Sequence, residues 1–313
     1  MNNGTATLDR LTFDGVLAIA RREILMLAVT SQTHDLDTQA VSAARLRWAL
    51  QRLASRAVED ARETDVRYVA VQRAAKRWLP VGPALGLPAT TLARLLDRWH
   101  EPSVGGRLEA SSTTLDALEL DDLELTEIQL RRAKLLRISG LRARFDRIDA
   151  IGATFDDCCF EASSMGQGIF DDSFLARCDL SRTNLERARF RAARLTGCDL
   201  NGSVLTNANI NHAIFTDCDF RGTSFAATSA TTLVTVVNAR FIRCDLRASG
   251  WAGRCLDEVS FVDCKFYGAH GAPWLEDVVI ERPDLSSAAD GSRIGTKSDV
   301  DAGWRTLVGR VRT

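Results

Sequence analysis

Six cysteines recur at intervals that could bring their thiols together. The interval is 20 residues on each side of one longer gap, and the residues are Cys158, Cys178, Cys198 and Cys218, then Cys244 and Cys264. Thiols that face one another can bind a soft metal, form disulfides or take part in redox chemistry. The chain has no CxxC pair, and its four histidines are scattered without metal-ligand spacing. The backbone that carries these cysteines therefore decides what they can do.

That backbone shows a second, shorter period. Every fifth residue from Phe155 to Phe225 is large and apolar, and a small residue such as Cys178, Thr183 or Ala188 stands two positions before it. A period of five fits neither an α-helix nor a flat strand. A repeat this regular is typical of a solenoid, in which successive units stack to bury one continuous core.

The repeat resembles the pentapeptide-repeat family in the stretches CDLSRTNLERARF, CDLNGSVLTNANI and CDFRGTSF. The resemblance implies a right-handed quadrilateral parallel β-helix with four pentapeptides per coil and the apolar and small residues inside. Extended backward, the frame reaches Leu115, with lapses at Gly140 and Ala150. Forward, it resumes one residue out of phase at Phe241 and runs to Phe266. We therefore predict a solenoid over residues 110–285.

In such a fold 20 residues make one coil, so the six cysteines are predicted to stack on a single inner face. Neighbouring coils lie about 4.8 Å apart, which allows disulfide formation by distance, but stacked side chains run parallel rather than toward each other. A buried free cysteine behaves as a small apolar residue. The pattern favours a structural core ladder over a metal or redox site, and we predict no cofactor.

The cysteine ladder also reveals an insertion. Cys218 and Cys244 are 26 residues apart, which places six extra residues within 226–240. This segment is rich in Thr and Val and contains no acid. It is either a partner-binding loop or a loop folded over a coil face. The candidate contact residues are Leu233, Val234, Val236 and Val237, together with a basic band midway along the solenoid at Arg187, Arg189, Arg191 and Arg194.

Residues 1–109 are predicted to form a helical bundle. Apolar stripes indicate helices over 16–29, 41–58 and 66–79, and a shorter one from Thr90 or Thr91 to Trp99. The segment 84–98 is similar to a helix-turn-helix, in which Thr90, Thr91, Arg94 and Arg98 would face DNA. Pro80, Gly82 and Pro83 stand where its first helix belongs, so a plain helical connection is the favoured interpretation.

The tail, residues 286–313, is predicted to be a linker followed by an amphipathic helix. Its apolar face is Val300, Trp304, Leu307, Val308 and Val311. A solenoid must cover its apolar ends, so a cap on the last coil of a monomer is favoured. The alternative is a dimer that forms through this C-terminal region.

Charge and motifs exclude several classes of function. The net charge is −1, made up of +3 over 1–109, −6 over 110–285 and +2 over 286–313. No apolar run reaches membrane-spanning length and no signal peptide is evident, so we expect a cytoplasmic protein without a membrane partner. No phosphate-binding loop, dinucleotide-binding or nucleophile-elbow motif is present, and we predict that the chain is not an enzyme.

The expected fold class is α+β multidomain: a helical bundle, a pentapeptide-repeat solenoid and a capping helix. The predicted function is a non-enzymatic scaffold or adaptor that binds another protein. Some members of the family protect DNA gyrase against quinolones by mimicking duplex DNA, which is the alternative. A duplex as long as this solenoid, roughly 40 Å, would carry about 23 charges. Because the solenoid carries −6 and a basic band, nucleic-acid mimicry is disfavoured. A DNA-binding regulator acting through 84–98 is the lesser alternative.

Overall fold

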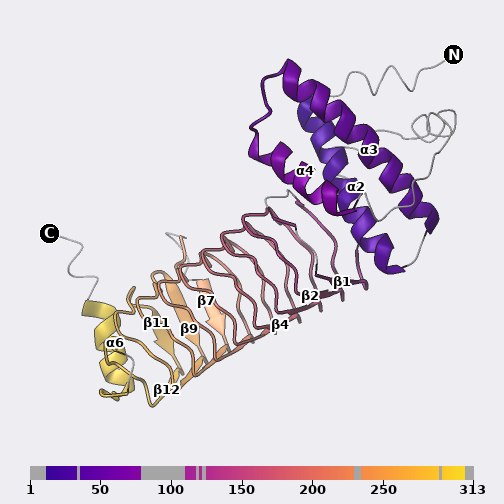
Figure 1. Ribbon diagram of the computed structural model, residues 1–313. Coiled ribbons are helices and arrows are strands. Elements are labelled where there is room, and N and C mark those ends of the chain that lie inside the picture. The colour runs from indigo at the N-terminus through magenta and orange to yellow at the C-terminus, as the bar shows by residue number, and fades with distance from the viewer. Residues whose placement is uncertain are drawn as a thin grey trace.

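The structure is a computed structural model that describes residues 12–33, 36–78, 110–117, 120–121, 125–228, 234–288 and 291–306. Among these residues, three helices lie at one end of a long stack of coils, and a fourth helix lies at the other end (Figure 1). The stack is a parallel β-solenoid of about 8 turns, as the five-residue period predicts.

The N-terminal helices are α2 (Phe13–Thr33), α3 (Leu36–Glu59) and α4 (Val66–Trp78). Each buries one apolar stripe, represented by Ile24 on α2, Leu46 on α3 and Val71 on α4, all of them fully buried. The Thr12 hydroxyl accepts a hydrogen bond from the Gly15 backbone N–H at 3.2 Å and so caps α2. The predicted helix ending at Trp99 lies outside the described residues.

One charged pair is enclosed by this helical bundle. The Glu23 side chain on α2 is 1% exposed and lies 3.8 Å from Arg45 on α3. Burial raises the pKa of Glu23, while a hydrogen bond to Ser42 and the charge of Arg45 oppose the shift. Helix α2 also contacts the first strand of the solenoid, so the bundle covers that end of the apolar stack (Figure 1).

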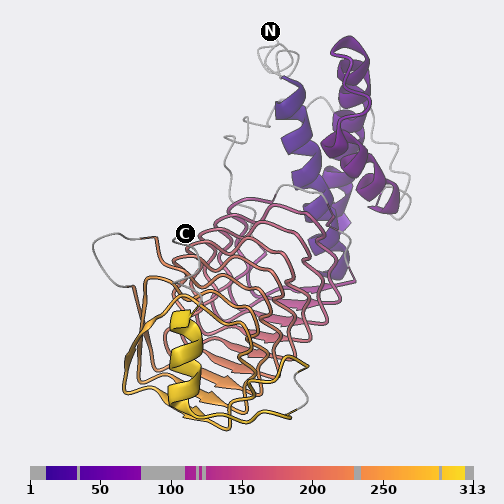
Figure 2. The same cartoon turned by 90° about the vertical axis from the view of Figure 1, so that its left-hand side faces the viewer.

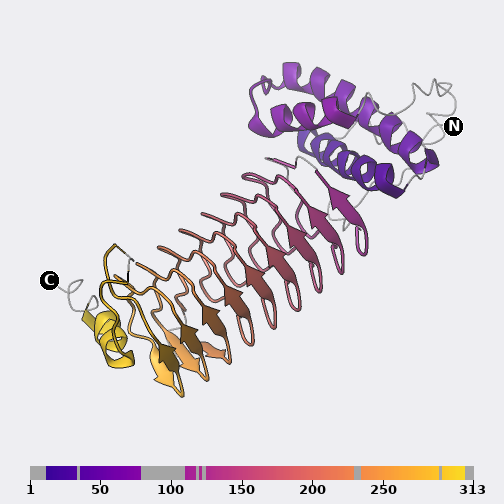
Figure 3. The same cartoon turned by 60° about the horizontal axis from the view of Figure 1, so that its bottom comes forward.

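Short parallel strands line the solenoid. Nine of them form one sheet along its full length, with one strand per coil (Figure 3). In sheet order they are β1 (Thr114–Asp116), β2 (Lys134–Leu136), β3 (Thr154–Asp156), β4 (Phe174–Ala176), β5 (Arg194–Thr196), β6 (Ile214–Thr216), β8 (Arg240–Ile242), β10 (Ser260–Val262) and β12 (Val279–Glu281). A second sheet of three strands contains β7 (Val234–Val237), β9 (Arg254–Asp257) and β11 (Trp274–Glu276).

The repeat explains this geometry residue by residue. The central apolar residues of the pentapeptides from Phe155 to Phe225 are at most 2% exposed. Phenylalanines of neighbouring coils stack on one another, for example Phe170 on Phe190 with ring centroids 4.8 Å apart. At the corners the small residue closes a turn: the Ser163 N–H donates to the Phe160 carbonyl at 3.1 Å, and Ala162 between them has φ +56°. Five residues therefore make one side of a coil and one corner.

The insertion interrupts only one side of one coil. Strand β6 pairs with β8 at an offset of 26 residues, where the other full-coil offsets between β1 and β6 are 20. The bridges of another side run from Arg189 to Asn209 and resume only in β7, which begins at Val234. The six extra residues therefore lie between Thr228 and Thr235, inside the predicted range 226–240.

Helix α6 (Lys297–Thr306) closes the far end of the solenoid, as predicted (Figure 2). Trp304 is fully buried and meets Phe266, Phe261 and Trp251 at centroid distances of 5.7, 6.2 and 6.4 Å. The Thr296 hydroxyl accepts from the Asp299 N–H at 3.3 Å, and the Asp299 carboxylate accepts from the Thr296 N–H at 2.8 Å. This reciprocal cap fixes where the helix starts. Leu307, Val308 and Val311 lie outside the described residues.

Candidate functional site

The outward side chains of the solenoid stand in columns, because the same two positions of each pentapeptide point away from the core. On the nine-stranded sheet these are the residues before and after each buried centre. Several of them are apolar: Leu136, Phe174, Ile214, Ile242 and Val262. Phe174 is the largest of these side chains and is 43% exposed. We call the outward surface of this sheet the nine-stranded face.

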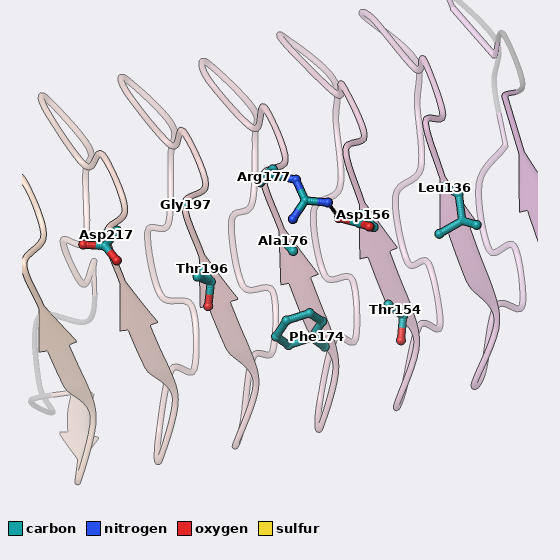
Figure 4. Close-up of a pocket in the computed structure, with 9 residues that line it drawn as sticks. All are labelled: Leu136, Thr154, Asp156, Phe174, Ala176, Arg177, Thr196, Gly197 and Asp217. Atoms are coloured by element: carbon teal, nitrogen blue, oxygen red, sulfur yellow. Dashed lines mark hydrogen bonds and ion pairs between the residues drawn. The ribbon is translucent and has the colours of Figure 1, made fainter.

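A hollow of about 460 Å³ lies on the nine-stranded face beside Phe174 (Figure 4). Small side chains form its floor, chiefly Ala176 and Thr196, while the Phe174 ring and the Arg177 side chain rise at its edges. The full lining is Leu136, Thr154, Asp156, Phe174, Ala176, Arg177, Thr196, Gly197 and Asp217. An apolar side chain of a partner could pack against the Phe174 ring there and contact the hydroxyls of Thr154 and Thr196.

Ion pairs between successive coils border the hollow. Arg177 pairs with Asp156 of the coil before it, and Arg243 pairs with Asp217 through two hydrogen bonds of 2.7 Å. Arg243 lowers the pKa of Asp217. Between these two pairs the corner residue is Gly197, with φ +61° and no side chain. The row of charged corners therefore opens at the hollow. Because these pairs are exposed, each adds only a little stability.

The next face along each coil has the opposite character. There the column before the buried centres is a run of aspartates on successive coils: Asp179, Asp199, Asp219 and Asp245. Each accepts a hydrogen bond from the backbone N–H two residues ahead, for example Asn201 N–H to Asp199 Oδ1 at 2.8 Å. Burial raises the pKa of Asp199, and the neighbouring aspartates add to that shift. We call this surface the aspartate face.

The aspartate face is only partly neutralised. Arg221 contacts Asp219 at 2.6 Å and Arg247 contacts Asp245 at 2.7 Å. Within the part of the chain that the structure describes, no arginine or lysine pairs with Asp179 or Asp199. Two adjacent faces of one rod thus differ sharply in chemistry.

The predicted basic band does not form a single patch. Arg189 and Arg191 lie on one side of the coil, where Asp171 binds the Arg189 guanidinium and the Arg191 backbone N–H. Arg187 stands at a corner, 3.6 Å from Glu186. Arg194 belongs to β5 on the nine-stranded face and is in register with Phe174. The five-residue frame turns the chain at each corner, so four arginines within eight residues point in different directions.

All six ladder cysteines are buried and free. Their thiols donate to backbone carbonyls, as Cys198 Sγ does to the Leu175 carbonyl at 3.5 Å. Burial raises the pKa of the Cys244 thiol, and it also raises the pKa of the half-buried Cys159, to about 11. Among the described residues, no group of three histidine, cysteine or acidic side chains is placed to hold a metal ion.

The candidates in the insertion have different placements. Val236 is the buried centre of its pentapeptide and is 1% exposed, so it cannot contact a partner, and its prediction as a contact residue was wrong. Val237 is half-buried. Leu233 and the side chain of Val234 lie outside the described residues, as do Thr90, Thr91, Arg94 and Arg98 of the segment similar to a helix-turn-helix.

Sequence reasoning missed the hollow beside Phe174. Its signal was present: an aromatic residue at an outward position, followed by the small residues Ala176 and Gly197 at neighbouring outward positions. Such residues become informative only when the coil places them side by side. None of the helices in the described ranges is long and apolar enough to span a membrane.

No curated protein sequence matches the chain. HetL, a pentapeptide repeat protein involved in heterocyst differentiation regulation from the cyanobacterium Nostoc sp., is 17% identical, with 59% of this chain and 91% of HetL covered and a TM-score of 0.35. A trypsin-treated form of QnrB1, a plasmid-mediated fluoroquinolone resistance protein, is 14% identical, with coverage of 56% and 90% and a TM-score of 0.33.

A third solved structure, Rfr23 from the cyanobacterium Cyanothece 51142, is 14% identical, with coverage of 57% and 91% and a TM-score of 0.23. The architecture defines a parallel β-solenoid built from five-residue units. Residues 168–233 match the family model described as pentapeptide repeat region. This part of the solenoid, which includes the stretch CDLSRTNLERARF, therefore matches the pentapeptide-repeat family, as the sequence pattern predicts.

Proposed function

We propose that this chain is a non-enzymatic scaffold that binds another protein on the nine-stranded face, with the hollow beside Phe174 as the anchor point. One observation supports this most: a 43%-exposed phenylalanine stands over a hollow floored by small side chains. Binding energy concentrates where an aromatic or apolar anchor enters a pocket and excludes water. Arg194 is in register with Phe174 on the neighbouring strand and supplies a charge on the same face.

The rigidity of the solenoid supports the same proposal. Every coil is fixed to its neighbours by backbone hydrogen bonds and by stacked side chains, so the outward columns keep their positions. The scaffold therefore loses little conformational entropy when a partner binds. The mixture of apolar side chains and bordering ion pairs fits a protein surface better than a uniformly charged polymer.

The test compares two matched substitutions. Phe174→Glu places a charge in the hollow, whereas Val204→Glu changes a similarly exposed residue, 39% exposed, on another side of the coil. The full chain and both variants are used to capture proteins from the native host, and the bound proteins are quantified by mass spectrometry. We expect Val204→Glu to retain a partner that Phe174→Glu loses.

A photo-activated cross-linking residue at Thr196 sharpens this experiment. Thr196 lines the hollow, so a bound partner should cross-link there and not at position 204. Thermal unfolding of each variant checks that the fold is intact. Equal capture by both glutamate variants, with equal cross-linking at both positions, would show that the nine-stranded face is not the binding surface.

Mimicry of duplex DNA, as in protection of gyrase, is the second candidate, and the aspartate face favours it. Four carboxylates on successive coils form a regular line of negative charge. Arg221 and Arg247 neutralise two of the four, which weakens the likeness to a phosphate backbone. A gyrase supercoiling assay with a fluoroquinolone tests it. Restored supercoiling that is lost on substitution of Asp179 and Asp199 by asparagine would favour mimicry over the scaffold.

A further inference from the structure

Arg254 is an arginine in a place where the repeat puts a small residue. It stands two positions before the buried centre Leu256, as Cys244 and Ser249 do before theirs, and it is 1% exposed. Within the described ranges, its side chain donates to three backbone carbonyls and to no carboxylate. Burial lowers the pKa of Arg254 to about 10, so the guanidinium is still charged at neutral pH. A buried charge of this kind needs a specific reason.

Regular coils satisfy the carbonyls around this position in three ways. The residue before a centre donates its N–H to the preceding coil, as Asn209 does to the Ala188 carbonyl at 2.9 Å. The small residue closes its corner, as Ala208 N–H does to the Leu205 carbonyl at 3.0 Å. A hydroxyl or thiol on the small residue can add a third bond, as Thr223 does to the Leu200 carbonyl at 2.7 Å.

The insertion diverts these donors. Thr228 N–H should close the corner on the Phe225 carbonyl, but it donates instead to the Asn207 side chain at 3.0 Å. The column of bridges that reaches Asn209 has no continuation until β7. Among the described residues, no backbone N–H donates to the carbonyls of Phe225 and Ala208, where a regular coil would supply one, and a buried carbonyl without a donor is costly.

The Arg254 guanidinium reaches these same carbonyls. Its Nε donates to the Phe225 carbonyl at 2.5 Å, and its Nη2 donates to the Ala208 carbonyl at 2.9 Å and to the Leu205 carbonyl at 3.3 Å. Ala208 lies two coils before Arg254, so the side chain crosses the level of the interrupted coil. Its Nη1 has no hydrogen-bond partner among the residues that the structure describes.

Gly253, the residue before Arg254, lets the backbone approach the preceding coil closely. Gly253 has φ +72°, and a Cβ built on it would lie 2.6 Å from the Ala227 carbonyl oxygen. Ala227 N–H in turn donates to the Ala252 carbonyl at 2.7 Å. On the adjoining side, Phe225 still stacks on Trp251 at 4.1 Å. Phe225 and Ala227, which directly precede the insertion, are thus held in contact with the next coil.

We propose that Arg254 makes the six-residue insertion possible: its guanidinium replaces the backbone and side-chain donors that the insertion diverts, and it fills the inward place of the interrupted coil. Arg254 is then a positioning residue for the insertion. This inference concerns how the coil is built and stands whether or not the nine-stranded face binds a partner.

The proposal predicts that Arg254→Ala changes the stability of the full-length protein and of a deletion variant in opposite directions. Deleting Ser229–Val234 joins Thr228 to Thr235 and restores the five-residue frame, with Thr228 as the small inward residue before the centre Val236. Thr228 then supplies the corner N–H and occupies space that the guanidinium crosses. Arg254→Ala should therefore weaken the full-length protein and strengthen the deletion variant.

The experiment is a double-mutant cycle measured by urea unfolding. The variants are Arg254→Ala in both backgrounds, Arg254→Met as an apolar side chain of similar length, and Arg240→Ala as an exposed control. In the full chain, Arg254→Ala and Arg254→Met should each lower the folding equilibrium constant by more than about tenfold, because even one unsatisfied buried carbonyl costs about that much. Arg240→Ala should change little.

In the deletion background, Arg254→Ala should raise the unfolding midpoint. If Arg254→Ala prevents folding of the full chain but folds well in the deletion variant, the proposal is also supported. It is overturned if Arg254→Met is as stable as the wild type, if Arg254→Ala acts with the same sign in both backgrounds, or if the deletion carrying Arg254→Ala does not fold.

Discussion

The regular coils and the interrupted coil satisfy the same backbone groups with different donors. In a regular coil, backbone N–H groups at fixed offsets along the chain donate to the carbonyls of the small residues and of the buried centres, as Asn209 does to Ala188 and Ala208 does to Leu205. In the interrupted coil a single side chain, Arg254, reaches three carbonyls on two earlier coils. We infer that a solenoid can accommodate an insertion when a later side chain replaces the hydrogen-bond donors that the insertion diverts.

Removing a stacked phenylalanine on either side of the insertion tests whether the two regions are equally well packed. Phe190 stacks on Phe170, and Phe215 stacks on Phe241 across the 26-residue offset, both with centroids 4.8 Å apart. Phe190→Ala and Phe215→Ala should each cost about 3–5 kcal/mol in urea unfolding, because a rigid stack cannot close over the void. A much smaller cost for Phe215→Ala would mean that packing is loose next to the insertion.

Two glycines sharpen the comparison with a smaller effect. Gly222 in a regular corner has φ +64° and open space around it, so Gly222→Ala should cost about 1–2 kcal/mol through its left-handed conformation alone. Gly253 adds the close approach of the Ala227 carbonyl, so Gly253→Ala should cost about 3 kcal/mol or more. Chemical unfolding of both variants measures the difference. Equal costs would show that the backbone at Gly253 has room to move.

The smallest expected difference between the two regions is in the reactivity of the ladder cysteines. Cys218 and Cys244 lie before and after the insertion, and both are buried with raised pKa values. Their reaction with a thiol reagent in the folded protein should be slow and should match on the two sides, because a thiol reacts only where reagent can reach it. Half-buried Cys159 supplies the faster reference within the same chain. Mass spectrometry of the labelled peptides locates each reaction.

Much of the solenoid could be predicted from the sequence because the same five-residue packing pattern recurs in successive coils. Large apolar residues every five positions gave the buried centres, and the gap from Cys218 to Cys244 located the insertion to within a few residues. The helix predicted in the tail is also confirmed, since Trp304 on α6 packs against Phe266 near the end of the solenoid.

Other features depend on positions that no local pattern encodes. An inward arginine contradicts the rule that requires a small residue, so the partners of Arg254 could not be foreseen. The direction of Arg187, Arg189 and Arg191 depends on which corner each follows. The hollow requires Phe174 and Gly197, 23 residues apart, to be neighbours. Each of these is set by stacking between coils, which the period indicates only in outline.

The central claim is that the solenoid is one rigid stack despite its insertion, and hydrogen exchange followed by mass spectrometry tests it most directly. Peptides from 200–227 and from 234–262 should show opening free energies that agree within about 1 kcal/mol, as expected for one cooperative unit. Such a result would support a rigid scaffold whose nine-stranded face keeps its shape from Phe174 to Val262. If the peptides beyond the insertion exchange through a separate opening that is several kcal/mol easier, the insertion divides the solenoid and the account is wrong.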